Sequence, residues 1–157
     1  MAEPYGVLFL CKHNASRSLM AEAILNKAGA GRFVAYSAGL EPSRHAHPYT
    51  LQVLEDEGFD VENLQPKSVQ QFLGEDAPKI DMVIGLCQSV QEDSELDGLF
   101  PMTAHWHISD SDSVSADSEA EKEAFSHVLR QLSQRIHLLT SLPEAKLEHL
   151  AHPDMAE

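Results

Sequence analysis

The stretch that decides the fold runs from Gly6 to Ser18 and reads GVLFLCKHNASRS. Its first five residues are apolar, as expected of a short strand that is buried on both faces. Apolar side chains three and four positions apart follow it, which predicts a helix over residues 18–28. Between strand and helix lies a loop from Cys11 to Arg17, with five residues between these two. The stretch therefore predicts a strand–loop–helix unit with a cysteine at the carboxyl end of the strand.

The rest of the chain continues this alternation. Further strands are expected over residues 33–37, 80–84 and 102–108, and further helices over residues 47–58, 68–73 and 119–139. Residues 109–118, rich in serine and aspartate, are expected to form a loop, and residues 143–157 a peripheral helix or tail. This order predicts an α/β fold with a parallel sheet, helices on both faces and right-handed crossovers, in a single domain of residues 1–157.

Composition narrows the function classes. The 157 residues include 25 acidic and 11 basic side chains, for a formal net charge of −14. Such an excess of acid argues against nucleic-acid or anionic-membrane binding. No apolar run approaches the roughly 20 residues of a membrane span, and the first residues do not resemble a signal peptide. We therefore expect a cytoplasmic protein, in which two cysteines 76 positions apart are more often chemical than structural.

The loop has the composition of an oxyanion site. Backbone N–H groups of a loop at a helix N-terminus converge on one point, and the helix dipole favours negative charge there. Arg17 adds a planar guanidinium fork. The helix dipole and the Arg17 guanidinium are also expected to lower the pKa of Cys11 and so to produce a nucleophilic thiolate. Ser18 could donate to that thiolate, and Asn14 could hold the loop in shape. The expected oxyanion-binding residues are Lys12, His13, Asn14, Ala15, Ser16, Arg17 and Ser18.

With these residues in view, the chain resembles the low-molecular-weight tyrosine phosphatase superfamily, and more closely the arsenate reductases built on that fold. The resemblance rests on the loop and on several later segments, which are Met20-Ala21-Glu22-Ala23, Tyr36-Ser37-Ala38-Gly39, Leu86-Cys87 and Pro101-Met102-Thr103-Ala104-His105-Trp106. It implies a three-layer α/β/α architecture around a four-stranded parallel sheet in the order 2-1-3-4.

The resemblance also implies a reaction. Cys11 would attack arsenate held by the loop and Arg17, Asp110 would act as general acid, and a second thiol would open the adduct and release arsenite. That thiol would be Cys87 or an external thiol. The external reductant would be thioredoxin, glutathione with glutaredoxin, or a similar thiol. No bound cofactor and no metal are implied, and the ligands expected are arsenate or phosphate.

Cys87 has two interpretations. A cysteine after an apolar strand is often a small core residue. In the strand order that the resemblance implies, however, the first and third strands are neighbours, so Cys11 and Cys87 would leave the sheet side by side. Neighbouring strands lie about 4.8 Å apart, and a disulfide joins Cα atoms roughly 4.4–6.8 Å apart. This spacing favours a resolving thiol.

Three departures from the family pattern stand out. Asp110 is followed by Ser111 where relatives usually have proline, which makes Asp112 a second candidate acid, and both could instead belong to a solvated acidic loop. The third cysteine of thioredoxin-coupled relatives is missing from residues 88–99. Some relatives bind potassium through four residues. Asn14, Glu22 and Ser37 match three of them, but Val69 replaces the aspartate, so no such site is predicted.

Two other functions stay open. A phosphatase acting on phosphotyrosine or a small phosphomonoester would share the first chemical step, although residues 110–113 offer no aromatic wall for a substrate ring. A non-catalytic oxyanion-binding module would not need Cys11, Arg17 and Asp110 together, because binding requires no acid.

His105 is expected to be a structural partner near the site rather than a catalyst.

Overall fold

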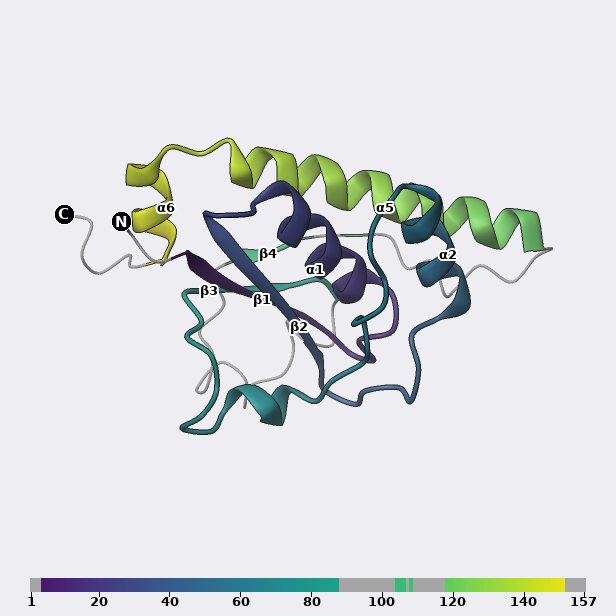
Figure 1. Ribbon diagram of the computed structural model, residues 1–157, viewed down its shortest axis with the longest axis horizontal. Helices are drawn as coiled ribbons and strands as arrows, with labels where there is room; N and C mark the ends of the chain where they lie inside the picture. Colours follow the sequence, from purple (N-terminus) through teal and green to yellow (C-terminus); the bar gives the residue numbers. More distant parts are fainter. Residues whose placement is uncertain (1–3, 88–103, 107, 109–117, 152–157) are drawn as a thin grey trace.

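Four parallel strands form one sheet at the centre of the molecule (Figure 1). The structure, a computed structural model, describes residues 4–87, 104–106, 108 and 118–151. The strands are β1 (Tyr5–Cys11), β2 (Phe33–Gly39), β3 (Met82–Gly85) and β4 (Ala104–His105). Their order is β2-β1-β3-β4, and every pairing is parallel. This confirms the predicted α/β class and the strand order 2-1-3-4.

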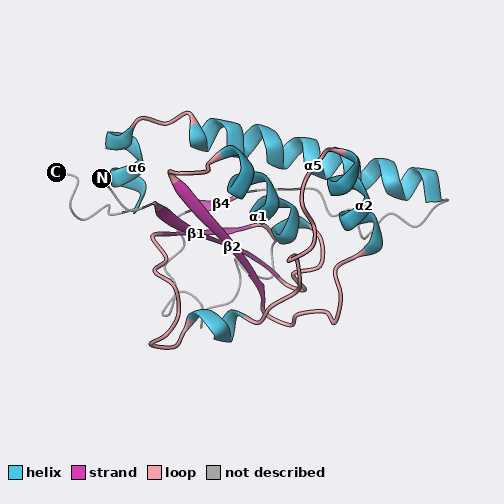
Figure 2. Cartoon of the chain, in the orientation of Figure 1, coloured by secondary structure: helices cyan, strands magenta, loops and turns pink. Residues whose placement is uncertain are grey.

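Helices follow the strands in the predicted positions (Figure 2). They are α1 (Arg17–Ala28), α2 (Pro48–Asp56), the 3₁₀ helix η1 (Val69–Phe72), α5 (Ser118–Thr140) and α6 (Glu144–Ala151). The predicted helix over residues 47–58 is shorter at both ends: His47 is the N-cap, and its ring accepts a hydrogen bond from the Tyr49 N–H. The expected peripheral helix near the carboxyl end is α6.

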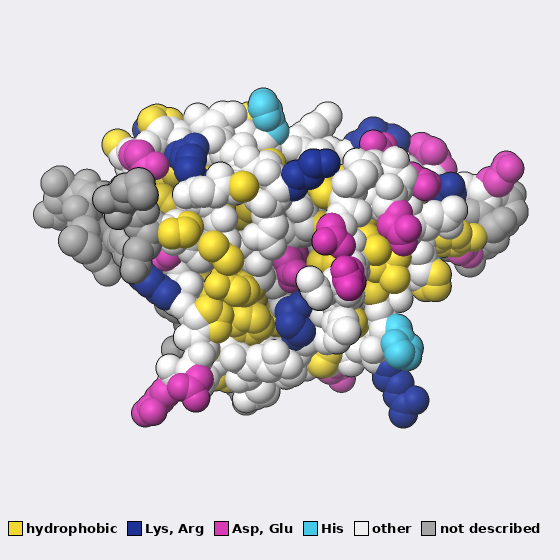
Figure 3. Space-filling model, in the orientation of Figure 1, with side chains coloured by type: hydrophobic (Ala, Val, Ile, Leu, Met, Phe, Trp, Pro, Cys, Tyr) yellow, Lys and Arg dark blue, Asp and Glu magenta, His cyan; other side chains and the backbone are white. Residues whose placement is uncertain are grey.

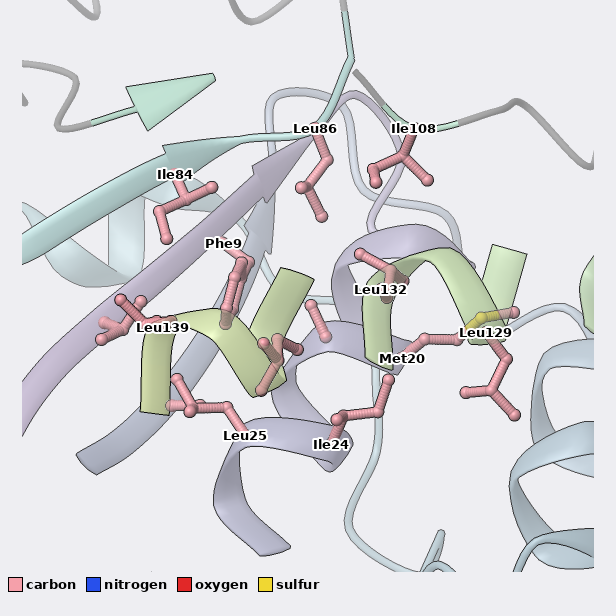
Figure 4. Close-up of a cluster of buried hydrophobic side chains, with 14 of the residues drawn as sticks. Phe9, Met20, Ile24, Leu25, Ile84, Leu86, Ile108, Leu129, Leu132 and Leu139 are labelled. Atoms are coloured by element: carbon pink, nitrogen blue, oxygen red, sulfur yellow. The ribbon is translucent and has the colours of Figure 1, made fainter. Parts of the chain in front are cut away.

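The core forms because side chains of a strand alternate between the two faces of the sheet. Val7 and Phe9 of β1 face α1 and α5. In Figure 4, Phe9 lies among side chains from α1, from β3 and from α5. Leu8 and Leu10 point to the opposite face, where they pack with Phe72 of η1. Full burial of such a side chain contributes about 1.5–3 kcal/mol to stability, so both faces of β1 hold it at the centre.

The third strand begins two residues later than predicted. Its expected first residues were Ile80 and Asp81, whereas β3 starts at Met82. The Asp81 carboxylate accepts a hydrogen bond from the Gly6 N–H at 2.8 Å, while the Asp81 N–H donates to the Gly6 carbonyl. The Asp81 carboxylate thus occupies the Gly6 N–H of β1, a backbone donor that a longer β3 would use.

Two expectations reach beyond the described residues. Only Ala104–His105 of the predicted strand over residues 102–108 is described as a strand. Of the expected loop over residues 109–118, residues 109–117 lie outside the described part, and Ser118 is the first residue of α5. None of the described helices is long and apolar enough to cross a membrane. On the face that Figure 3 shows, Lys and Arg side chains stand singly among acidic and neutral ones.

Candidate active site

Two cysteine thiols meet where β1 and β3 end. The ladder between these strands finishes at the pair Leu10 and Gly85, so Cys11 lies one residue and Cys87 two residues past it. Neither cysteine forms a disulfide and both are buried, and the Cys87 side chain lies close enough to Cys11 to raise its pKa. The structure therefore brings together the two thiols that the strand order predicted to be neighbours.

The ionisation of Cys11 differs from the prediction. The hydrogen bond with the Cys87 side chain and then burial raise the pKa of the Cys11 thiol well above its ordinary value. The Arg17 guanidinium and the Lys12 N–H lower this pKa by less. The prediction of a lowered pKa is wrong for Cys11, because the Cys87 side chain and burial outweigh the Arg17 guanidinium and the Lys12 N–H.

The loop after Cys11 is held open by hydrogen bonds on its outer side. The carbonyls of Cys11, Lys12, His13 and Ala15 accept bonds from the N–H groups of residues 40, 41, 43 and 47 at 2.8–3.3 Å. A trans peptide group points its N–H opposite to its C=O. The N–H groups of the four following residues therefore face the interior of the loop, and the Lys12 N–H reaches the Cys11 sulfur. This is the convergent set of donors that an oxyanion requires.

Asn14 holds the tightest part of the loop. Its φ of 51° is left-handed, a conformation that asparagine adopts more readily than most residues. Its side chain is fully buried, donates to the Ser18 Oγ at 2.6 Å and accepts from the Lys67 N–H at 2.8 Å. Asn14 thus ties the loop to α1 and to the segment before η1, as its expected holding role requires. Ser18 can still donate its own hydroxyl hydrogen, because a hydroxyl both accepts and donates.

Lys67 belongs to a cluster of polar side chains next to the loop, and the sequence did not predict this cluster. Its Nζ lies 3.3 Å from the Glu22 Oε1, 3.5 Å from the Ser37 Oγ and 2.8 Å from the Gln65 carbonyl. Ser37 in turn donates to Glu22 at 2.6 Å. The ammonium group therefore lies beside two of the three side chains that matched the potassium pattern. Among the described residues, no group of three or more His, Cys, Asp or Glu side chains could hold a metal ion.

Arg17 reaches from the start of α1 to the backbone that follows β3 and β4. Its Nη1 donates to the Leu86 carbonyl at 3.1 Å and to the Ile108 carbonyl at 3.4 Å. The Ser16 side chain does not cap the helix, so the N–H groups in the first turn of α1 remain suited to an anion beside Cys11. The Arg17 guanidinium is suited to the same anion.

The remaining predicted residues divide into two groups. The Lys12 side chain pairs with Glu41 at 3.6 Å and the His13 Nδ1 lies 3.1 Å from the Glu41 carbonyl, so these two residues serve the loop through their backbones. The expected acid Asp110 and its alternative Asp112 lie outside the described residues, as do residues 88–99.

His105 touches Cys87 through its ring. The His105 Nε2 lies 2.9 Å from the Cys87 carbonyl oxygen. The sequence placed His105 near the site without naming this partner, and the segment over residues 40–47 that supports the loop was also missed. The sequence signal for that segment is indirect and consists of Gly39, the residue before it. A Cβ at Gly39 would lie 2.9 Å from the Lys12 carbonyl, so the glycine leaves room for the chain to pack closely against the loop.

Comparison with known proteins agrees with this geometry. The model of the family described as low molecular weight phosphotyrosine protein phosphatase matches residues 6–149, which is most of the chain. The chain belongs to this family. The family prediction drawn from the loop and the later segments is therefore confirmed.

Similar proteins carry arsenate reductase names. A glutaredoxin arsenate reductase of Synechocystis is 38% identical over 81 residues, which cover 52% of this chain and 59% of that protein. An arsenate reductase of Halalkalibacterium halodurans is 25% identical over 83% of this chain and 91% of its own. A solved arsenate reductase in the phosphate binding state is 31% identical, with a TM-score of 0.70, over 87% of this chain and 97% of its own.

Proposed function

We propose that this protein is an arsenate reductase that uses Cys11 as nucleophile and Cys87 as resolving thiol. The observation that carries the proposal is the position of two buried cysteines, neither in a disulfide, just past the adjacent ends of β1 and β3, where the Cys87 side chain acts on Cys11. A phosphatase hydrolyses its covalent adduct with water and needs one thiol. Reduction of arsenate needs two electrons, which two neighbouring thiols supply when they become a disulfide.

The first step forms a sulfur–arsenic bond. Arsenate enters the loop, where inward N–H groups and Arg17 neutralise its charge. The Cys11 thiolate attacks arsenic, and one arsenic–oxygen bond breaks. The departing oxygen leaves as water after it takes a proton from a general acid, which we assign to Asp110. Arsenic is still As(V) in this adduct.

The second step transfers the electrons. The Cys87 thiol loses its proton and attacks the Cys11 sulfur, so that a sulfur–sulfur bond forms and the sulfur–arsenic bond breaks. Its electron pair goes to arsenic, which leaves as arsenite, As(III). The two cysteines are oxidised to a disulfide, and an external thiol reductant restores them. The glutaredoxin in the name of the Synechocystis relative supports a thiol donor of this kind. Use of two reduced thiols fits a reducing compartment such as the cytoplasm.

A phosphatase of a small phosphomonoester is the second candidate, and the description of the matching family favours it. The same loop would bind phosphate, and Cys11 would form a phosphocysteine that water opens. Cys87 would then have no chemical role.

The deciding experiment compares wild type, Cys87→Ser and, as control, Cys11→Ser. We expect wild type given arsenate without reductant to stop after one turnover, with a Cys11–Cys87 disulfide found by peptide mass analysis. Cys87→Ser should hydrolyse an aryl phosphate but release little arsenite with a dithiol, whereas Cys11→Ser should do neither.

Two outcomes would change the assignment. Full arsenite release by Cys87→Ser with glutathione would mean that the external thiol opens the adduct, and the protein would remain a reductase without a resolving Cys87. Steady phosphate release without arsenite, under every thiol tried, would make the protein a phosphatase.

A further inference from the structure

The backbone around Cys87 is held by the sheet as far as Leu86, whose N–H donates to the Leu10 carbonyl at 2.9 Å, and by side chains beyond it. β3 ends at Gly85, whose carbonyl accepts a bond from the Trp106 N–H at 2.9 Å. The next carbonyl, of Leu86, accepts from Arg17, and that of Cys87 lies 2.9 Å from the His105 Nε2. Three successive carbonyls thus meet three donors, and the last donor is a ring on the neighbouring strand.

The His105 ring reaches this carbonyl because of the register of β4. His105 is paired with Gly85, two residues before Cys87. A carbonyl oxygen only accepts hydrogen bonds, so the Nε2 carries the hydrogen. The neutral tautomer with hydrogen on Nε2 and the protonated ring both donate there, so the contact does not depend on the charge of His105. The ring is half-buried, so apolar packing alone does not account for its placement.

We propose that His105 is a positioning residue for the Cys87 thiol. The ring holds the Cys87 carbonyl, and with it the main chain, so that the Cys87 sulfur lies against the Cys11 sulfur. Its importance for turnover rests on the proposed resolving role of Cys87. The effect of His105 on the distance between the two thiols does not depend on that role, because the distance is set by the position of the backbone.

The rate at which one thiol attacks another in the same molecule depends on the orientation of the two sulfur atoms. A displacement of about 1 Å can slow such a reaction on the order of 100-fold. Cys87 lies past the last ladder pair of β3, so loss of the ring would remove a contact that fixes the position of its carbonyl. The thiol would then leave Cys11 for part of the time, and the hydrogen bond that raises the pKa of Cys11 would be lost with it.

The test uses two variants of matched chemistry and different reach. In His105→Gln the side-chain amide nitrogen stands near the position of the Nε2, whereas in His105→Asn it falls short. His105→Leu removes the donor altogether. Disulfide formation is timed after addition of arsenate, and separately with the thiol oxidant diamide in the absence of arsenate. The pH dependence of Cys11 alkylation by iodoacetamide is measured alongside, with Cys87→Ala for comparison.

We expect His105→Leu and His105→Asn to form the Cys11–Cys87 disulfide about 10- to 100-fold more slowly, and His105→Gln to restore most of the rate. Cys11 should become alkylated at lower pH in the two defective variants, as in Cys87→Ala, because the Cys87 thiol no longer opposes its ionisation. A general loosening of the site would also expose Cys11, but it would not distinguish His105→Gln, which keeps a donor in place, from His105→Asn.

Wild-type rates of disulfide formation and an unchanged alkylation profile in a folded His105→Leu would overturn the proposal. If that variant does not fold by circular dichroism, equal rates in His105→Gln and His105→Asn would overturn it. Failure of the proposed function gives a different pattern: Cys87→Ser would release arsenite at the wild-type rate, while the diamide reaction would still depend on His105.

Discussion

At the scale of single residues, Cys11 is surrounded by groups with opposite effects on its ionisation. The Arg17 guanidinium and the Lys12 N–H favour the thiolate, whereas the Cys87 thiol and burial oppose it. Together these effects raise the pKa of Cys11, so the first proposed step depends on Arg17 and the Lys12 N–H to favour the thiolate that attacks arsenic.

Replacement of the proposed acid tests the first step. Asp110→Asn should lower the rate of arsenite release about 10²- to 10⁴-fold, the usual loss when a general acid is removed. Affinity for phosphate as a competing oxyanion should stay equal or rise, since a negative charge is removed. Steady-state kinetics with phosphate inhibition measure both quantities. Asp112→Asn is the matched control, and a larger defect in that variant would transfer the acid role to Asp112.

At the scale of elements, the oxyanion loop is shaped by the chain that packs against it. Residues 40–47 donate hydrogen bonds to the outer carbonyls of the loop, and both the His47 N–H and the Thr50 hydroxyl donate to the Ala15 carbonyl. Gly39, the last residue of β2, lies close enough that an added Cβ would be 2.9 Å from the Lys12 carbonyl and 3.0 Å from the Asn14 N. The end of β2 and the start of α2 therefore support the loop from outside.

A methyl group at this contact should disturb the loop. Gly39→Ala should lower stability by about 1–3 kcal/mol, the usual cost of overpacking, and weaken phosphate binding, because the atoms it meets belong to the loop backbone. Thermal unfolding and phosphate titration measure the two effects. Gly74→Ala is the control, since a Cβ there would meet nothing within 4 Å. Equal phosphate affinity in Gly39→Ala and wild type would show that the loop does not depend on this packing.

At the scale of the whole molecule, the buried thiol pair links folding to pH. The raised pKa of Cys11 means that the folded protein keeps a proton that the unfolded chain releases above about pH 8.5. A group with a raised folded pKa stabilises the fold fully below its unfolded pKa and loses that contribution as the pH rises. Alkaline solution should therefore destabilise the reduced protein through this site.

The expected dependence can be measured by denaturant unfolding of the reduced protein. Its free energy of unfolding should fall between pH 8.5 and 10, with a slope that approaches about 1.4 kcal/mol per pH unit for one proton. Cys11→Ala should lack this component. Parallel curves for the two proteins would contradict the raised pKa of Cys11.

The local parts of this protein could be predicted from the sequence. The apolar run of β1, the 3–4 spacing of α1 and the loop between Cys11 and Arg17 all depend on neighbours in the chain, and the structure places them within a residue of the prediction. Periodicity and loop composition report such short-range geometry. The family resemblance added the strand order, and with it the meeting of Cys11 and Cys87.

Only the tertiary structure decided how the site is held and how its thiol ionises. The contact of Arg17 with Leu86 spans 69 positions, that of Lys67 with Asn14 spans 53, and that of His105 with Cys87 spans 18. No periodicity encodes a bond between a side chain and a distant part of the backbone, because its geometry depends on strand register and on where each strand ends. The pKa of Cys11 was mispredicted for the same reason: the helix and Arg17 are visible in the sequence, whereas burial and the thiol opposite exist only in the folded chain.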